Sequence, residues 1–501
     1  MHLLVDVLVP FAWLAAGYAW VRNIQPMKSR LEAWALGFPL GASGFAALLF
    51  LLSVSGVRIV QATVLFLLVG WVVLPLWVSR AGRISRAEAK QDARARATTL
   101  SPIYLVLILA GIGLALSGVF LAIGRSYSTW DAIAIWSVKG YGIALEGSVF
   151  AAREWGAHGL AYPLNIPLQI AVFRILEGDH LPASKLIFVA YYASLVIGAF
   201  AFWRRYDRGG VAPYLGALFL ATTPVVFEHA TDGYANLPFA TCLVLGALEA
   251  VQGMRDSDTR SLFASGLLFG AGVWTRPEGI LVALSVYLAL WIVRPGSFAG
   301  WKARVIWWAP FVLSTAIWLV FAQAAGAGGP AEMAPRMALA EIRSGEFHLD
   351  AFYWIARHLG REAMAPNSWG LAIPVCLSLI LLHAHKLRSG TGLDARTILI
   401  ASLAAGIATA VAYYGLSFLG DLRAWLGTGV TRMFLSAGTL AMIGAITLAL
   451  EQGGRAAEPL AASPYVGTHR ALPRARLPAS DALGGSNASA AAGAGGVEIR
   501  P

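Results

Sequence analysis

Apolar runs of about 20 residues recur through the first 450 positions of the chain and constrain its fold more than any other feature. A helix of that length crosses a hydrocarbon core of about 30 Å. Hydrophobic residues make up 58% of the chain and charged residues only 13%, whereas a soluble domain carries roughly 25% charged residues. The sequence therefore predicts an all-α polytopic membrane protein.

We expect about thirteen of these runs to cross the bilayer. Tryptophans stand near several run ends, as in the aromatic belts at membrane interfaces; examples are Trp13, Trp77, Trp203 and Trp301. The first run carries no basic segment before it and no clear cleavage site, so we expect it to be retained as a span. The expected spans are residues 3–21, 32–54, 58–79, 101–123, 183–203, 211–228, 237–254, 261–275, 279–293, 304–325, 368–384, 397–418 and 431–450.

The net charge of +11 comes mostly from arginines in short segments between these runs. In a soluble protein such a charge would suggest nucleic acid, but here it orients the chain, with basic loops in the cytoplasm. These loops alternate with the spans only if residues 163–176 do not cross, and a helix there would be about 21 Å long, too short to span. We expect a re-entrant or interfacial helix. The basic loops are 22–30, 80–96, 204–208, 255–260, 294–304 and 386–396.

Two further features limit the chemistry. Cys242 and Cys376 both fall inside apolar runs, so the sequence supports neither a disulfide framework nor a cysteine metal site. The segment 451–501 is rich in Ala, Gly, Ser and Pro, cannot bury a core, and is expected to be a disordered tail.

Acidic residues stand just beyond two of the spans, on the face predicted to be non-cytoplasmic. Asp131 lies between Trp130 and Trp136 in a segment that can form an interfacial helix over residues 130–146, and Asp232 lies in a second outer segment. An acid at a water-filled membrane mouth is a functional candidate. The alternatives are that Asp131 caps or flanks a helix and that Asp232 belongs to an ordinary turn.

Arginines reach the same face. Arg276 stands beside a proline in a short turn, and Arg432 lies near the outer end of a late span. A guanidinium group holds phosphate oxygens in a bidentate fork. The alternatives are an ion pair from Arg276 to Glu278 or Asp232, and an interfacial position for Arg432.

Acids and arginines on one face are what transfer from a phosphate-linked donor requires. A carboxylate takes the proton of an acceptor hydroxyl, and cations hold the leaving phosphate. The order and spacing of the motifs over residues 101–450 resemble the GT-C superfamily of integral-membrane glycosyltransferases, in particular bacterial enzymes of the protein O-mannosyltransferase or aminoarabinose transferase type, which use polyprenyl-phosphate sugars. The motifs are Trp130-Asp-Ala132, Tyr162-Pro-Leu-Asn-Ile-Pro-Leu-Gln169, Asp232-Gly-Tyr-Ala-Asn-Leu-Pro238, Thr275-Arg-Pro-Glu-Gly279, and Trp425 with Thr428, Thr431 and Arg432.

The resemblance implies an inverting transfer with a lipid phosphate as the leaving group. Asp131 would be the general base, and Asp232 would orient the acceptor or bind a divalent cation, Mg²⁺ or Mn²⁺. Arg276 and Arg432 would bind the donor phosphate. The remaining implied contacts to substrate are His158, Tyr162, Tyr234 and Glu278.

The resemblance also implies an organisation and a location. Residues 1–100 would hold extra N-terminal transmembrane helices and a basic cytoplasmic loop, and 101–450 the GT-C-like catalytic core. The protein would be a multi-pass protein of the bacterial inner membrane, with its active site facing the periplasm or exterior. It would act on a glycan, lipid or protein acceptor and bind no nucleic acid. Trp-Asp-Ala stands where several members have an Asp-Glu pair, and Asn236 where a second aspartate sometimes stands, so metal dependence stays open.

Three other classes stay open as alternatives. A secondary transporter also places acids and broken helices in the membrane, but near the midplane and often within internal repeats, and no repeat is evident here. A polysaccharide polymerase or O-antigen ligase usually relies on arginines in a large outer loop. A structural scaffold gives no reason for the clustered acids. Loop 326–367 is amphipathic, and we assign it no chemistry.

Overall fold

The regular secondary structure of the described chain is entirely helical, which confirms the predicted class. A computed structural model describes residues 2–25, 28–81, 102–178, 181–294, 300–326, 340, 343–345, 348–418 and 422–451. The predicted tail, most of loop 80–100 and much of loop 326–367 lie outside these residues.

Eight of the described helices are long and apolar enough to cross a membrane, so the chain is a polytopic membrane protein. They are α1 (His2–Ile24), α2 (Arg30–Val54), α3 (Gln61–Ala81), α5 (Pro102–Gly124), α8 (Leu186–Trp203), α11 (Asn236–Asp256), α14 (Trp301–Ala324) and α19 (Leu393–Leu416).

Shorter helices occupy the other five predicted spans, and a total of thirteen crossings therefore stays a prediction. Several of them pair with longer helices: α12 packs between α11 and α14, and α19 packs against both α13 and α21. They are α9 (Ala212–Thr222), followed by the short α10 (Pro224–Glu228), α12 (Thr259–Val273), α13 (Gly279–Val293), α17 (Ala372–Leu382) and α21 (Leu435–Leu450).

The first two helices pack into the same hydrophobic core as the later ones. Helix α2 contacts α8, α11 and α12, and the apolar stretch of α11 is completely buried. Gly37 and Gly41 face α1 in a G-x-x-x-G spacing, and a Cβ atom on Gly41 would lie 1.9 Å from the carbonyl oxygen of Trp13. The two backbones therefore cross at a distance that only glycine permits, as in close helix pairs of membrane proteins.

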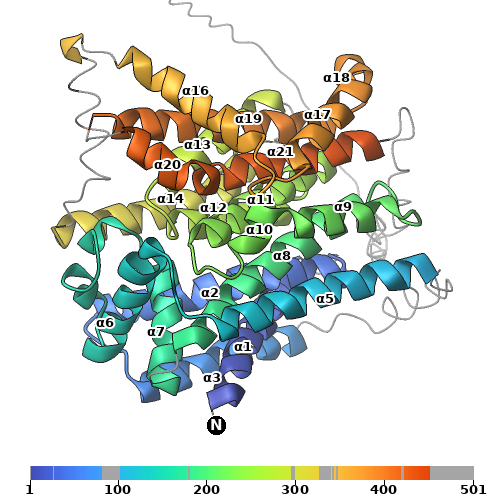
Figure 1. The fold of residues 1–501 in the computed structure, drawn as a ribbon. Coiled ribbons are helices and arrows are strands. Elements are labelled where there is room, and N and C mark those ends of the chain that lie inside the picture. The colour runs from blue at the N-terminus through green and yellow to red at the C-terminus, as the bar shows by residue number, and fades with distance from the viewer. Residues whose placement is uncertain are drawn as a thin grey trace, which may run out of the picture. The chain divides into compact units, whose positions relative to one another are not determined.

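The loop that the charge pattern predicts to be the first outer loop folds into short helices. The π-helix η1 (Ala132–Ser137) continues into α6 (Val138–Glu146), followed by the 3-10 turns η2 (Val149–Arg153) and η3 (Gly159–Ala161) and by α7 (Asn165–Glu177). Helix α7 has 13 residues and runs across the direction of α5 and α8 in Figure 1. It corresponds to the segment predicted not to cross the bilayer.

The π-helix has a visible cause. The carbonyl oxygen of Ala134 accepts a hydrogen bond from the amide of Ala157 at 2.8 Å, so a loop residue 23 positions further along the chain bonds to a carbonyl of the helix. Gly156, beside it, has φ +84°, and a Cβ there would lie 2.5 Å from the same carbonyl oxygen. Single π turns within helices occur frequently at functional sites.

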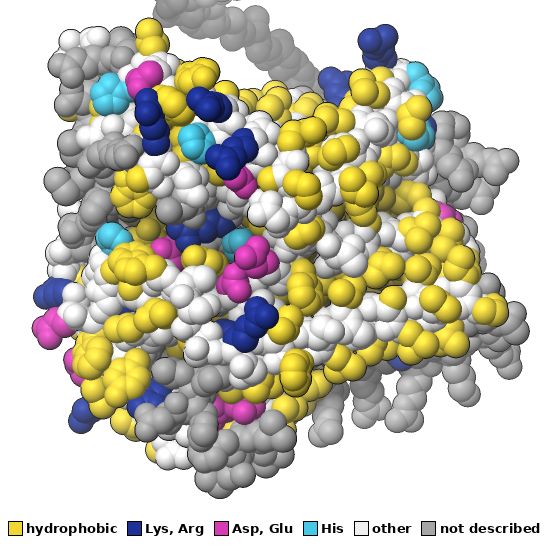
Figure 2. Space-filling view, viewed as in Figure 1, with side chains coloured by type: hydrophobic (Ala, Val, Ile, Leu, Met, Phe, Trp, Pro, Cys, Tyr) yellow, Lys and Arg dark blue, Asp and Glu magenta, His cyan; other side chains and the backbone are white. Residues whose placement is uncertain are grey.

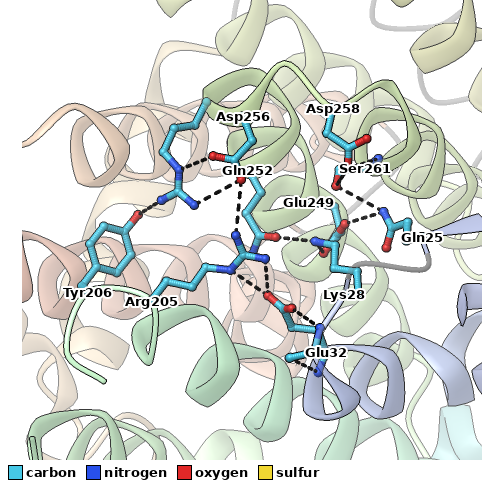
Figure 3. A network of polar contacts seen from close by, with 12 residues as sticks. Gln25, Lys28, Glu32, Arg205, Tyr206, Glu249, Gln252, Asp256, Asp258 and Ser261 are labelled. Atoms are coloured by element: carbon cyan, nitrogen blue, oxygen red, sulfur yellow. Dashed lines mark hydrogen bonds and ion pairs between the residues drawn. The ribbon is translucent and has the colours of Figure 1, made fainter. Parts of the chain in front are cut away.

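Buried ion pairs join the helices at the end that the basic loops predict to be cytoplasmic (Figure 3). Lys28, in the α1–α2 connection, pairs with Glu249 of α11 at 2.8 Å, and both side chains are almost fully buried. Arg205, beyond the end of α8, pairs with Glu32 of α2 at 2.5 Å. Removing one partner of a buried pair costs about 3–5 kcal/mol, because the other charge stays behind. These pairs therefore fix α1 and α2 onto the rest of the bundle.

Two late helices pack on each other beside the main bundle. The amphipathic helix α16 (Leu349–Ala363) packs on α20 (Leu422–Met433), where Ile355 and Leu426 are buried in a small second core. Helix α20 matters for the site because its last turn carries Arg432.

Candidate functional site

The structure joins the predicted acid of the first outer loop to the last predicted arginine. Asp131 stands immediately before η1, and Arg432 lies in the last turn of α20. Nη1 of Arg432 lies 2.8 Å from Oδ2 of Asp131, with 18% and 14% of the two side chains exposed. The pair is therefore mostly enclosed but open enough to meet a ligand.

Tyr234 and Asn236 complete the surroundings of Arg432. The guanidinium carbon of Arg432 lies 4.7 Å from the centre of the Tyr234 ring. The side-chain amide of Asn236 donates to the carbonyl oxygen of Arg432 at 3.1 Å and accepts from Nη1 of Arg276 at 2.7 Å. Asn236 thus holds both predicted arginines.

Arg276 is fully engaged. Its Nε donates to Glu278, its Nη1 to Asn236, and the residue is only 5% exposed. The ion-pair alternative for Arg276 and Glu278 is therefore present in the structure. The role in phosphate binding stays a prediction, and it would require this arginine to exchange a partner.

The turn that carries Arg276 is fixed to α7. Asn165, the first residue of α7, donates its backbone amide to the carbonyl oxygen of Trp274 at 3.1 Å. Its side-chain amide donates to the hydroxyl of Thr275 at 2.9 Å. The motifs around Tyr162 and Thr275, more than 100 residues apart in the sequence, therefore form one rigid part of the site.

An aromatic wall borders the acid. The ring of His158 lies 5.5 Å from Tyr162 and 6.0 Å from Trp130, and Trp136 meets Tyr162 edge to face at 5.5 Å. Burial raises the pKa of Tyr162 to about 12, while nearby arginines oppose and nearby acids, including Asp131, reinforce the shift. Burial also lowers the pKa of His158, so its imidazole is neutral near pH 7. The wall is thus uncharged.

Asp232 has a separate set of charged neighbours. Burial and then the charge of Glu228 raise its pKa to about 6, against the opposing charges of Lys185 and Arg125. The chain turns directly after it at Gly233, where φ is +84° and a Cβ atom would lie 2.5 Å from the Tyr127 ring. This turn separates Asp232 from Tyr234, which contacts Arg432.

A divalent cation finds few ligands here. The described residues contain no group of three or more His, Cys, Asp and Glu side chains placed to hold a metal ion. The nearest charged partner of Asp131 is an arginine, and Asp232 has other neighbours. The donor set therefore does not fit a bound metal, and no step below uses one.

The sequence analysis missed two buried polar residues beside this site. Lys139 is 0% exposed, its Nζ lies 5.3 Å from the centre of the Tyr162 ring, and no hydrogen-bond partner for it is found among the described residues. Burial lowers its pKa to about 7. The sequence did contain a signal for Lys139: it is a basic residue in a loop predicted to be non-cytoplasmic, where basic residues are not expected.

His229 is the other missed residue. Its Nδ1 bonds to the carbonyl oxygen of Val225 at 2.8 Å, and its buried Nε2 lacks a partner within the described chain. Burial, together with the charges of Arg432 and Arg276, lowers its pKa to about 4, against the opposing effect of the hydrogen bond to Val225. The ring lies 5.5 Å from Tyr234. His229 directly follows Glu228 in the sequence, and in this segment only the acidic residues were considered as candidates.

Figure 2 shows acidic, basic and histidine side chains side by side in the middle of one face, with hydrophobic side chains covering the helices beside them.

Comparisons of the chain with protein-family models, with curated proteins and with solved structures found no match. The residues themselves therefore carry the functional argument.

Proposed function

We propose that the protein is a membrane glycosyltransferase that moves a sugar from a polyprenyl-phosphate donor to an acceptor hydroxyl on the non-cytoplasmic face. The observation that carries the proposal is the partly exposed ion pair between Asp131, just before η1, and Arg432, in the last turn of α20, both in segments predicted to lie at the outer surface. It combines a proton acceptor with a phosphate-binding cation at the level where a lipid headgroup and an aqueous acceptor meet.

Asp131 acts as the general base. Arg432 engages its Oδ2, so we assign Oδ1 to the acceptor hydroxyl. The hydroxyl oxygen attacks the anomeric carbon as Asp131 takes its proton, and the bond from that carbon to the lipid-phosphate oxygen breaks. The phosphate leaves with the electron pair, and the sugar configuration inverts. General-base catalysis of this kind contributes typically 10²–10⁴-fold.

The arginines differ in their availability to the phosphate. Arg432 keeps 18% of its side chain exposed, whereas Arg276 is buried and bonded to Glu278 and Asn236. We therefore assign the first phosphate contact to Arg432. Arg276 adds positive charge near the site without touching the phosphate. It also donates a hydrogen bond to Asn236, whose side chain in turn donates to the backbone carbonyl of Arg432.

The neutral aromatic side chains suit a sugar. Tyr162 and His158 contact each other and feel the charge of Asp131, and the Tyr234 ring lies 4.7 Å from the guanidinium carbon of Arg432. Asp232 has charged neighbours of its own, Glu228, Lys185 and Arg125, and we assign it to accept a hydrogen bond from the acceptor rather than to take the transferred proton.

The test uses purified full-length protein and a panel of polyprenyl-phosphate sugars. Thermal stabilisation by one donor identifies the sugar, and incubation with candidate acceptors measures transfer. A protein that binds none of the donors, but moves a solute or proton across liposome membranes, would be the transporter of the alternative interpretation.

A further inference from the structure

A separate cavity lies where the connection between α2 and α3 meets the first outer loop. It has a volume of about 300 Å³, at the lower end of the range for small-molecule sites. Arg58, Val60 and Gln61 line it from the N-terminal side. Leu145, Gly147 and Arg174 line it from α6 and α7.

The walls of this cavity are held together by backbone contacts. The amide of Ile59 donates to the carbonyl oxygen of Gly147 at 2.8 Å. Arg58 donates from Nη2 to the carbonyl oxygen of Glu146 at 3.3 Å. Gly147 has φ +69° and ends α6 in a left-handed conformation, which favours glycine. The two halves of the cavity are therefore already assembled without a ligand.

The electrostatics of the cavity favour an anion. Its lining, within the described residues, includes two arginines and no carboxylate. The neighbouring carboxylate of Glu146 accepts from the indole of Trp155 at 2.5 Å instead. Arg174 is held in place by its guanidinium over the Tyr141 ring, 4.4 Å from the centroid, and by a hydrogen bond from Nη1 to the carbonyl oxygen of Gly178. Two guanidinium groups around one cavity suit phosphate oxygens, which they bind through charge-assisted hydrogen bonds.

The surroundings of the cavity favour a lipid. Gln61 is the first residue of α3, so the cavity lies at the end of a candidate span, where phospholipid headgroups are found. The adjoining side chains of Val60 and Leu145 are exposed, and α3 exposes Leu65, Val69 and, at 79%, Phe66. An acyl chain can lie along this apolar surface while its phosphate enters the cavity.

This cavity is distinct from the Asp131 site. Asn165, at the first turn of α7, bonds to the turn that carries Arg276, whereas Arg174 is nine positions further along the same helix, about 13 Å along its axis. A ligand in this cavity would therefore bind whether or not the protein has the proposed transferase activity.

We propose that the cavity between Arg58 and Arg174 binds the phosphate group of an anionic membrane lipid, with an acyl chain along the exposed face of α3. The bound lipid would connect the α2–α3 turn to helices α6 and α7. Phosphate chemistry is shared by a lipid headgroup and by the free ion, and the exposed apolar face beside the cavity favours the lipid.

Binding is measured with the full chain in detergent by native mass spectrometry, with phosphatidylglycerol, phosphatidylcholine and inorganic phosphate as probes. We expect phosphatidylglycerol to bind more tightly than the other two. The double variant Arg58→Gln/Arg174→Gln should weaken its binding by about tenfold or more, because charge-assisted hydrogen bonds are lost. Arg357→Gln, on exposed α16, is the matched control and should bind like the wild type.

Equal affinity for the two lipids overturns the proposal, and so does wild-type affinity in the double variant. Inorganic phosphate that binds as tightly as phosphatidylglycerol overturns the lipid as the ligand. A photoactivatable phosphatidylglycerol on the unmodified protein gives a readout that does not depend on folding of the variant. It should label α3 or α6, and labelling confined to other helices overturns the site.

Discussion

Replacement of Asp131 by asparagine separates catalysis from structure at the proposed site. Asparagine has the same shape and still offers an oxygen to Nη1 of Arg432, 2.8 Å away in the wild type, but it cannot take a proton. The rate of transfer should therefore fall by roughly 10²–10⁴-fold, the usual contribution of a general base.

The same substitution should affect the stability of the folded protein much less than it affects the rate of transfer. Less than a fifth of each partner is exposed, so the pair lies between a surface ion pair, worth about 0–1 kcal/mol, and a buried one, whose loss of one partner costs about 3–5 kcal/mol. Because asparagine keeps the hydrogen bond, we expect a loss of about 1–2 kcal/mol. The variant should still insert, fold and bind donor.

The assay compares product formation with donor-induced thermal stabilisation in the same preparations. Glu154→Gln is the matched control, since Glu154 is an exposed acid of the same outer loop. Wild-type turnover by Asp131→Asn would refute the base assignment. Loss of donor binding together with turnover would show that the ion pair serves binding rather than proton transfer.

Four further outcomes are expected. Stability of the wild type should fall as pH rises from about 4 to about 6, because the folded state holds the proton of Asp232 up to about pH 6 and the unfolded state releases it near 3.9; Asp232→Asn should flatten this part of the thermal-unfolding profile. Lys139→Met should raise the unfolding temperature near pH 7, with a difference that shrinks toward pH 10, because the pKa of this lysine is lowered to about 7 in the folded state; an equal gain at both pH values would contradict the unpaired amine. Lys28→Met should destabilise by about 3–5 kcal/mol, and adding Glu249→Leu should restore most of the loss, as a denaturation double-mutant cycle would measure. A cysteine at Glu154 should react with an impermeant reagent in intact cells, and reaction only after lysis would reverse the predicted topology.

Hydropathy was sufficient to predict the helical class, because the bilayer leaves a spanning backbone few other structures. It also identified α7 as a segment too short to cross, where 13 residues form a transverse helix. It could not separate spans from shorter apolar helices, since α12 and α17 have only 15 and 11 residues. Helix α12 is apolar because it packs between α11 and α14, whereas α17 exposes Leu377, Leu381 and Leu382.

The sequence predicted which residues belong to the site, but not which of them contact one another. Asp131 and Arg432 were each recognisable from chemistry and place in the chain, but their contact depends on how α20 packs against the outer loop. The hydrogen bonds of Asn236 to both arginine segments have the same origin. Burial of Lys139 depends on a fold of the loop that returns through Gly156, which no local pattern in the sequence specifies.

The number of residues in the π turn at 132–137 sets the direction in which Asp131 points relative to the helix that follows. A π turn holds one residue more than an α turn, and one residue corresponds to about 100° of rotation around a helix axis. Loss of any single residue from Ala132–Ser137 would let the segment relax to an ordinary α-helix. Asp131 would then point about a quarter-turn away from Arg432, although, unless the lost residue is Trp136, every side chain of the site would still be present. In this protein, an insertion or deletion of one residue in that segment is therefore a more severe change than most substitutions within it.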